Sequence, residues 1–400
     1  MNRRHVAMFL LLAPLAAGGS RAAGESSFDP TAATNAFGVD LYRQLHAEGS
    51  NLFFSPASIA GALSMTSIGA RGVTADEMDR VLHLSGDDAG VAAAFGDLMT
   101  TLTAANDHAT LNMANRLYGQ HDFGFSPAFL ALLDQHYKAG LEQVDFRADP
   151  DAVRSDINAW VESQTAHKIR DLLAPGSLHA GTRLVLVNAI HFLGTWQQPF
   201  AVDATTDGPF HRERGGDVTA PFMHVTGRFG YAEDGDVQIL ALPYKGGALE
   251  MVLILPAEGT SLSSVEAGLD AGKFAGWLAA PAPARVAVGL PRLHLETAFD
   301  LAGTLAALGM PNAFTAAADF SGLTTGGEPL NIDKVVHKAY LDVDEKGTEA
   351  AAATAVTMEV TSARPVEQLK VFTADRPFIL AIRHRDSGAV LFLGRVADPS

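Results

Sequence analysis

Residues that could carry out catalysis are present in the chain, but they do not form a known catalytic motif. The sequence contains fourteen His and no Cys. It lacks a G-x-S-x-G nucleophile elbow, an H-E-x-x-H zinc motif, a phosphate loop and a dinucleotide-binding glycine fingerprint. A Ser-His-Asp triad is recognised by geometry rather than by chain order, so the sequence leaves that arrangement open. Nothing in the residue pattern favours an enzyme, a bound cofactor or a metal site.

The segment 345–354, with the sequence EKGTEAAAAT, is the most informative part of the chain. Alanine is the best helix former, so local propensity alone favours a short helix here. Gly347 interrupts such a helix, and the residues on either side of the segment are typical of extended structure. In a strand, the small residues Thr348, Ala350, Ala352 and Thr354 would share one face, and that face could enter a crowded sheet. Both interpretations are open at this level.

The elements that must position this segment change period along the chain. Helical patterns extend from about residue 30 to 173, including an amphipathic run over 155–173 and a helix over 58–65 that Ser55 can cap. Strand patterns follow at 183–192, 237–242, 249–256, 285–295 and 390–396. This order predicts one α+β domain with mainly antiparallel sheets.

The first residues are typical of a secretory signal. Arg3, Arg4 and His5 precede an apolar run over 6–17, and small residues follow at 18–23. We therefore expect residues 1–23 to be a signal peptide and the protein to be secreted or periplasmic. No later segment approaches the roughly 20 apolar residues of a membrane-spanning helix.

Charge and cysteine content exclude several other classes. The net charge of −16 offers no basic footprint for nucleic acid or for an anionic membrane surface. Without cysteine the chain can form neither disulfides nor thiolate metal sites.

Five segments, taken in order, resemble the serpins, a family of serine protease inhibitors. The motif at 345–354 resembles the hinge of inhibitory serpins. The others are similar to the helix B region with its F-S-P-x-S element, to a strand of sheet A that carries Asn and Trp, to the strand that leads into the hinge, and to the closing signature of the family. These segments are 51–78, 184–196, 333–350 and 375–399.

This resemblance covers residues 28–399 and implies a single serpin domain of an exported, bacterial-looking member. The implied fold is α+β, with three mainly antiparallel sheets, about eight or nine helices and an exposed reactive-centre loop at 345–371. A serine protease would attack this loop and form a covalent acyl-enzyme. The cleaved loop would then insert into sheet A as a new strand and trap the protease. No cofactor is implied, and we expect a monomer.

The resemblance also assigns roles to individual residues. Trp196 corresponds to the residue packed where the hinge first enters sheet A. A polar cluster that gates the opening of the sheet corresponds to Ser55, Ser58, Asn188 and His337. The hinge itself consists of Glu345, Lys346, Gly347, Thr348, Glu349, Ala350, Ala351, Ala352, Ala353 and Thr354.

The family loop layout places the scissile bond between Thr361 and Ser362. A small, uncharged bait at Thr361 favours elastase-like or subtilisin-like targets, with Met358 as a secondary bait. Cleavage after Arg364 would indicate a trypsin-like target, but Pro365 follows that bond and the register is three residues late.

Two alternatives follow from the same residues. A non-inhibitory serpin acting as a binding or carrier protein is the main one, although such members usually have bulky, charged or Pro residues in the hinge. An enzyme with an unrecognised site is the other.

Overall fold

The computed structural model describes residues 28–46, 49–104, 108–137, 140–326, 329–348 and 368–399. In these ranges the chain forms nine α-helices and a π-helical turn, η1 (Leu133–Tyr137), which continues α5. The α-helices are α1 (Pro30–Leu45), α2 (Pro56–Ser67), α3 (Gly72–Leu82), α4 (Asp88–Leu102), α5 (Pro127–Leu132), α6 (Pro150–Gln164), α7 (Leu262–Ala267), α8 (Ala271–Ala279) and α9 (Ala302–Leu308). The expected signal peptide, 1–23, lies outside the described ranges.

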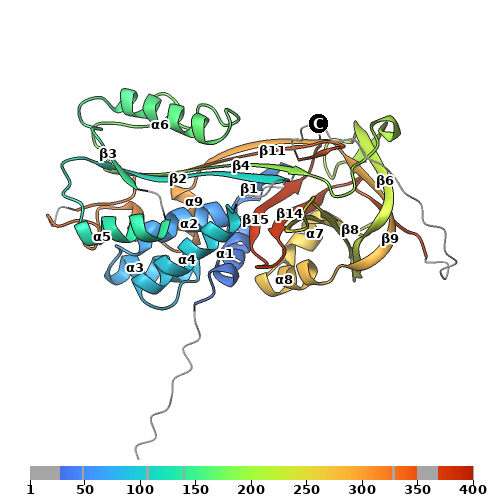
Figure 1. The fold of residues 1–400 in the computed structure, drawn as a ribbon, viewed down its shortest axis with the longest axis horizontal. Coiled ribbons are helices and arrows are strands. Elements are labelled where there is room, and N and C mark those ends of the chain that lie inside the picture. The colour runs from blue at the N-terminus through green and yellow to red at the C-terminus, as the bar shows by residue number, and fades with distance from the viewer. Residues whose placement is uncertain are drawn as a thin grey trace, which may run out of the picture.

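A six-stranded sheet, called the central sheet below, lies between α6 on one face and the helices α1 to α5 on the other (Figure 1). Its strand order is β10-β11-β12-β4-β2-β3. The strands are β2 (Ala109–Gln120), β3 (Leu141–Val144), β4 (Leu184–Thr195), β10 (Leu293–Asp300), β11 (Lys334–Val343) and β12 (Gly347–Thr348).

The remaining strands form a nine-stranded ladder that consists of two leaves. Its long strand β6 pairs through one end with β5 and β9 and through the other with β7. With the central sheet, the two leaves account for the three sheets that were expected. The strands of the ladder are β1 (Leu52–Phe54), β5 (Thr206–His211), β6 (Asp217–Asp234), β7 (Val237–Pro243), β8 (Leu249–Pro256), β9 (Ala282–Pro291), β13 (Lys370–Thr373), β14 (Phe378–His384) and β15 (Val390–Val396).

Helix α2 is buried along its whole length beneath the central sheet. Ser55 caps it, because the Ser55 hydroxyl accepts a hydrogen bond from the backbone N–H of Ser58, and Pro56 occupies the first helical position, where its missing N–H costs nothing. Each of its residues is buried, so small side chains such as Ala57 and Gly61 let it pack closely against its neighbours. The predicted capping role of Ser55 is confirmed.

Three sequence-based boundaries were wrong. The helical run predicted over 155–173 ends at Gln164, because Ala166 and His167 adopt positive φ values of 50° and 61°. The first half of the chain is not wholly helical, since it contains β2 and β3. The strand predicted over 285–295 is two strands, β9 and β10, separated at Arg292.

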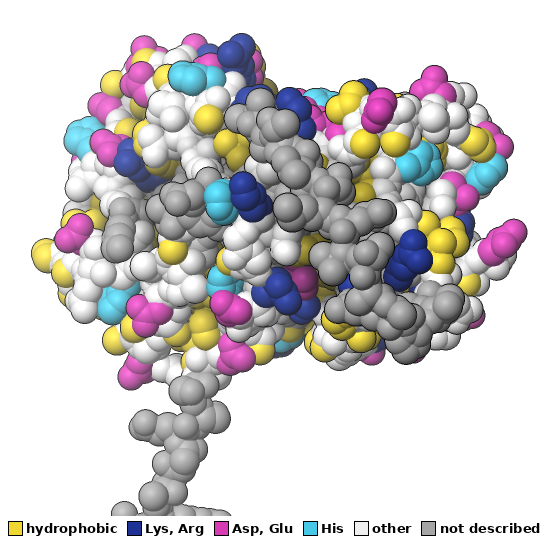
Figure 2. Space-filling view, turned by 45° about the vertical axis from the view of Figure 1, so that its right-hand side comes forward, with side chains coloured by type: hydrophobic (Ala, Val, Ile, Leu, Met, Phe, Trp, Pro, Cys, Tyr) yellow, Lys and Arg dark blue, Asp and Glu magenta, His cyan; other side chains and the backbone are white. Residues whose placement is uncertain are grey.

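On the face shown in Figure 2, acidic, basic and hydrophobic side chains are interspersed rather than segregated. No helix in the described part of the chain is long and apolar enough to cross a membrane.

Candidate functional site at the centre of the central sheet

Strands β4 and β11 lie side by side in the middle of the central sheet and are parallel. They pair from Val185 with Lys334 to His191 with Tyr340. We call this pairing the seam. Parallel pairing is slightly less stable per residue than antiparallel pairing, and in most sheets it is found where helices cover both faces. Separating the seam would therefore lose less hydrogen-bond energy than separating either of the longer antiparallel pairings beside it, β10 with β11 or β2 with β4.

Beyond Tyr340 the seam is already open, and the start of the hinge occupies the gap. After β11 the chain turns back, and β12 pairs antiparallel with both neighbours, because Thr348 lies opposite Gly194 of β4 and opposite Val343 of β11. The turn is closed by Asp344, whose carboxylate accepts hydrogen bonds from the backbone N–H groups of Lys346 (2.8 Å) and Gly347 (3.1 Å). The structure thus places the first residues of the hinge as a short strand inside the sheet.

Gly347 is required at this turn because the backbone of β4 lies directly against it. A Cβ atom at position 347 would lie 2.0 Å from the carbonyl oxygen of Gly194, well inside van der Waals contact. Since backbone cannot move aside as a side chain can, no other residue fits without displacing β12.

Trp196 and Tyr244 form the surface on which the hinge rests. The indole Nε1 of Trp196 donates a hydrogen bond to the carbonyl oxygen of Asp344 (3.0 Å). The backbone N–H of Trp196 donates to the carbonyl oxygen of Lys346 (2.9 Å). The two rings stack with centroids 4.6 Å apart. The hydroxyl of Tyr244 bonds the buried hydroxyl of Thr348 at 2.7 Å, and burial raises the pKa of Tyr244 above its ordinary value. The sequence indicated Trp196 beside the entry of the hinge, and no motif pointed to Tyr244, which is 104 residues from its partner Thr348.

Glu345 is anchored on the other side of the turn by an ion pair. Its Oε1 accepts hydrogen bonds from the guanidinium of Arg292 (2.6 and 3.0 Å) and from the hydroxyl of Thr205 (2.6 Å). Burial alone would raise the pKa of Glu345, but these hydrogen bonds outweigh it and hold the pKa below its ordinary value. The sequence indicated Glu345 as a hinge residue, and no motif pointed to Arg292 or Thr205.

The four predicted polar residues meet below the hinge, at the seam itself. His337 of β11 lies directly opposite Asn188 of β4 and hydrogen-bonds its side-chain oxygen. Nε2 of His337 accepts from the backbone N–H of Ser55 (3.1 Å), so the neutral ring carries its proton on Nδ1 and donates it to Asn188. Nδ2 of Asn188 donates to the hydroxyl of Ser58 (2.5 Å).

A fifth residue, Asn115 of β2, completes this group, which we call the polar cluster. Its Oδ1 accepts from the Ser58 hydroxyl (2.9 Å) and from Nδ2 of Asn188 (2.5 Å). No motif pointed to Asn115, because nothing in the sequence of β2 links it to residues 57 and 73 positions away. The polar cluster therefore connects α2, β2, β4 and β11 through side-chain hydrogen bonds.

Burial determines the charge state of the polar cluster. His337 is fully buried, and desolvation lowers its pKa to about 3. The ring is neutral at physiological pH, and the polar cluster contains no carboxylate. Ser55 contacts His337 through its backbone N–H rather than its hydroxyl, so this group lacks the hydrogen bonds of a catalytic triad. The polar cluster therefore holds neighbouring strands together by hydrogen bonds.

Other predicted site residues fall outside the part of the chain that the structure describes. These are Glu349, Ala350, Ala351, Ala352, Ala353 and Thr354 of the hinge, the predicted scissile pair Thr361 and Ser362, and the alternative baits Met358 and Arg364. Across the described ranges no group of three or more His, Asp or Glu residues is arranged to hold a metal ion.

Comparison with known proteins identifies the class to which this fold and site belong. The profile of the serpin (serine protease inhibitor) family matches residues 32–399. The chain is 42% identical over 379 residues to the leukocyte elastase inhibitor of Bos taurus, which covers 92% of this chain and 99% of that protein. It is 40% identical over 368 residues to an uncharacterized serpin-like protein of Thermococcus kodakarensis, covering 92% of this chain and 85% of that protein.

Solved structures agree with these sequence matches. Uncleaved ovalbumin superposes with a TM-score of 0.83 at 30% identity, over 93% of this chain and all of that one. Human thyroxine-binding globulin complexed with thyroxine also gives 0.83 at 30% identity, over 93% of this chain and 99% of that one. The chain belongs to the serpin family. These relatives come from animals and an archaeon, so they do not single out a bacterial origin.

Proposed function

We propose that this protein inhibits serine-type endopeptidases as a suicide substrate, with 345–371 as its reactive-centre loop and 28–399 as one serpin domain. The observation that carries the proposal is β12, a hinge strand seated between β4 and β11 at the open end of the seam. Apart from Glu349, the side chains that follow Thr348 as far as residue 355 are small, which suits continued insertion. Family membership and the leukocyte elastase inhibitor relatives support the same activity.

The covalent step is the first half of ordinary proteolysis. The catalytic serine oxygen of the protease attacks the carbonyl carbon of Thr361, and the peptide bond from that carbon to the nitrogen of Ser362 breaks. The proton of the protease serine passes through the protease's histidine to the departing nitrogen, so an ester links Thr361 to the protease and Ser362 becomes a new amino terminus. Water would normally hydrolyse the ester, so trapping requires that loop insertion distort the protease before that happens.

The register of β12 specifies where an inserting hinge would come to lie. When the pairing of Thr348 with Gly194 and Val343 is continued along both strands, Thr354 falls opposite Asn188 on one side and His337 on the other. Thr354 shares a strand face with Thr348, whose side chain points into the core. Its hydroxyl would therefore reach the polar cluster and replace the bond between Asn188 and His337 that separation of the strands breaks.

The size of the rearrangement suits the mechanism. Residues 348–361 as an extended strand would reach about 46 Å, at about 3.3 Å per residue. Net gains of about 1 kcal/mol per hydrogen bond give on the order of 10 kcal/mol for the new ladder. This is comparable with the whole stability of an ordinary domain, so the intact form would persist because the barrier to insertion is high.

The decisive experiment is incubation with elastase-, subtilisin-, chymotrypsin- and trypsin-type proteases, followed by denaturing electrophoresis. An SDS-resistant complex with an elastase- or subtilisin-type enzyme, and a released peptide that begins at Ser362, would support both the mechanism and the bait. A released peptide that begins at Pro365 would show that the protease cuts after Arg364, which would then be the bait residue. Simple cleavage by every protease, with no complex, would favour the carrier alternative.

Two finer points belong to the same proposal. We infer export with removal of residues 1–23, which amino-terminal sequencing of the mature protein would test. We also infer a monomer, which light scattering at micromolar concentration would test.

A further inference from the structure

Two large apolar side chains are exposed where the chain enters β13, the strand that follows the proposed reactive-centre loop. β13 is an edge strand of the nine-stranded ladder and pairs in parallel with β9. Leu369, one residue before β13, is 46% exposed, and Val371 is 60% exposed. Lys370 and Phe372 point to the opposite side, because Lys370 pairs with Glu233 and Phe372 is fully buried. Single exposed apolar residues are ordinary, but contiguous ones indicate a surface that can bind a partner.

Side chains of β9 and β6 extend this surface. Along each strand successive side chains point to opposite sides of the sheet, so residues two positions apart share a side. On the side of Val371 the three strands present two adjacent rows of side chains. We call these six residues the basic face, and its rows are Val371 with Ala287 and Thr226, and Leu369 with Arg285 and Arg228.

The next row along the strands shows that β13, β9 and β6 present side chains to the same side. A Cβ atom added at Gly289 would lie 3.2 Å from Cγ2 of Thr373 and 3.4 Å from Cε1 of His224. Every residue of the basic face except the small Ala287 is exposed. In Figure 1, β6 and β9 lie together at one end of the molecule, so the basic face can be approached from that end.

The basic face is positively charged on a chain that is acidic as a whole. The chain contains 45 Asp and Glu residues against 29 Lys and Arg, yet the six residues of the basic face include two arginines and no carboxylate. Arg228 and Arg285 lie directly opposite one another on antiparallel strands, and like charges in such a pair destabilise a sheet. The stability of the fold therefore gives no reason to place both arginines here, whereas a negatively charged partner does.

Chain length brings a protease at the proposed scissile bond close to this surface. Seven residues lead from Ser362 to Leu369, so these two residues are at most about 25 Å apart. A protease of roughly 200 residues has a radius of gyration of about 16 Å and is therefore about 40 Å across. The protease is wider than the connecting chain is long. The side of its cleft that holds the residues after the cut thus comes within reach of the basic face.

We propose that the basic face is a second contact surface for the attacking protease. Its partner is a protease that carries an acidic patch with an apolar centre on the side of its cleft that holds the residues after the cut. This inference rests on the proposed function and specifies its target further. The bait residue then selects proteases by their cleft, and the basic face selects among them by surface charge.

The composition of the basic face favours a protein over other negatively charged partners. Protein interfaces combine an apolar core with arginine, which is enriched there relative to the rest of the surface. A nucleic acid or a sulfated polysaccharide would bind the arginines through its charge and would leave Leu369 and Val371 without a role. Complementary charge also accelerates association, and this acceleration weakens as salt is added.

The test uses the intact protein and a protease that it traps, both in its active form and with its catalytic serine replaced by alanine. Calorimetry with the inactive form measures docking alone, and rapid kinetics with the active form measures the rate constant for complex formation. Arg228→Gln combined with Arg285→Gln should weaken docking and slow complex formation at least tenfold at low salt, and both effects should shrink as salt is added. The number of inhibitor molecules consumed per trapped protease should not change, because the loop and the seam are untouched.

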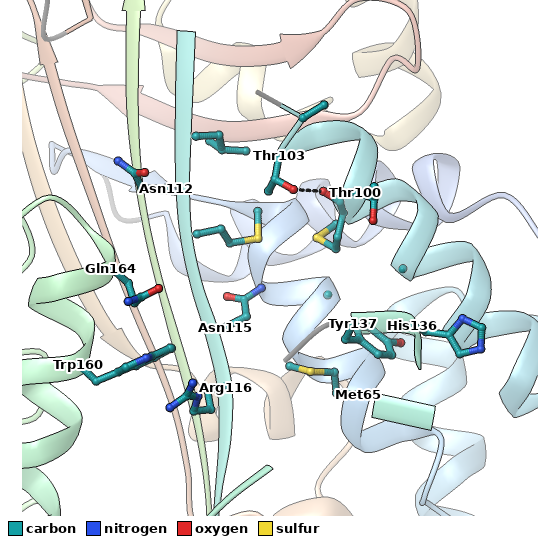
Figure 3. Close-up of a pocket in the computed structure, with 16 residues that line it drawn as sticks. Met65, Thr100, Thr103, Asn112, Asn115, Arg116, His136, Tyr137, Trp160 and Gln164 are labelled. Atoms are coloured by element: carbon teal, nitrogen blue, oxygen red, sulfur yellow. Dashed lines mark hydrogen bonds between the residues drawn. The ribbon is translucent and has the colours of Figure 1, made fainter. Parts of the chain in front are cut away.

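Matched controls separate the position of each substitution from its chemistry. Arg285→Gln alone should slow complex formation at least threefold. Thr100→Glu makes the same change in net charge on α4, where Thr100 is exposed at the edge of the hollow beside β2 (Figure 3), and should have no effect. Val371→Thr should also slow complex formation, whereas Val73→Thr, at a valine that is 62% exposed on α3, should not. The melting temperature of Arg285→Gln should not fall, because the substitution removes a like-charge pair.

Four outcomes would overturn the inference. Equal docking and equal rates in the double arginine variant and in Thr100→Glu would refute the basic face and leave the proposed function standing. A chain that traps no protease would refute the proposed function, and this inference with it. Dimers of the parent that the double variant cannot form, with docking unchanged, would assign the face to a second copy. Heparin binding that the double variant loses, with docking unchanged, would assign it to a polyanion.

Discussion

Thr348 is the residue on which the proposed insertion depends most, because it is the last residue of β12 and it is fully buried. Thr348→Arg would place an unpaired charge against Tyr244, and the cost of burying that charge would expel the hinge from the sheet. We expect the variant to be cleaved as an ordinary substrate, with covalent complex reduced more than tenfold on denaturing gels. Thr348→Ser keeps the hydroxyl and should trap protease as the parent does. Stoichiometric trapping by the arginine variant would contradict the mechanism.

His337 makes the seam sensitive to acid. Its pKa of about 3 in the folded protein lies below the ordinary value of 6.5. Between these two pH values the unfolded chain therefore binds a proton at this residue, whereas the folded chain does not. Stability from this group is complete above pH 6.5 and falls as the pH drops toward 3, by about 3 kcal/mol at pH 4. His191, whose pKa burial and Lys168 lower to about 4, acts in the same direction.

We therefore expect the melting temperature of the intact protein to fall between pH 6.5 and pH 4, and the fall to be smaller in His337→Gln. Differential scanning calorimetry across this range checks the prediction, with His224→Gln as the exposed-histidine control. An identical pH dependence in the parent and in His337→Gln would show that another group controls acid stability.

At the scale of elements, the position of β12 depends on its close packing against the backbone of β4. In Gly347→Ala the added methyl group collides with the backbone of β4, so β12 cannot keep its place between β4 and β11. We expect the number of inhibitor molecules consumed per trapped protease to rise several-fold, because insertion starts from a hinge outside the sheet. Gly276→Ala is the control, since a Cβ there meets nothing within 4 Å and alanine favours helix α8. A Gly347→Ala variant with parental stoichiometry would show that the seated hinge is not needed for trapping.

The sequence predicted helices and strands better than it predicted which residues contact one another across the fold. The cap at Ser55 and the strands around 184–195 and 390–396 follow from local pattern, since each is decided by neighbouring residues. Strand β2 was missed because its exposed and buried residues do not alternate cleanly. Tyr244, Arg292 and Asn115 were missed because each acts only through a partner that folding brings close, and no local signal encodes such a contact. The grouping of Ser55, Ser58, Asn188 and His337 was predictable only through family resemblance.

For the molecule as a whole, the intact form should be the less stable of two folded states. A protease that cuts the loop without being trapped would release it to enter the seam. We expect the clipped protein to melt higher than the intact one by on the order of 20 °C, from about 10 kcal/mol at about 2 °C or more per kcal/mol. Calorimetry before and after limited proteolysis measures the difference, and clipped Thr348→Arg is the control, which should gain little. A clipped parent that melts no higher than the intact protein would refute stored insertion energy.

The close approach of Gly347 to the Gly194 carbonyl also limits which substitutions this chain can accept during evolution. Where the backbone at position 347 packs against β4, glycine is the residue that fits, and a descendant that replaces it would displace β12. Under the proposed function, a substitution at the bait position alone would direct the protein to another protease, while Gly347 and the place of β12 in the sheet stay unchanged.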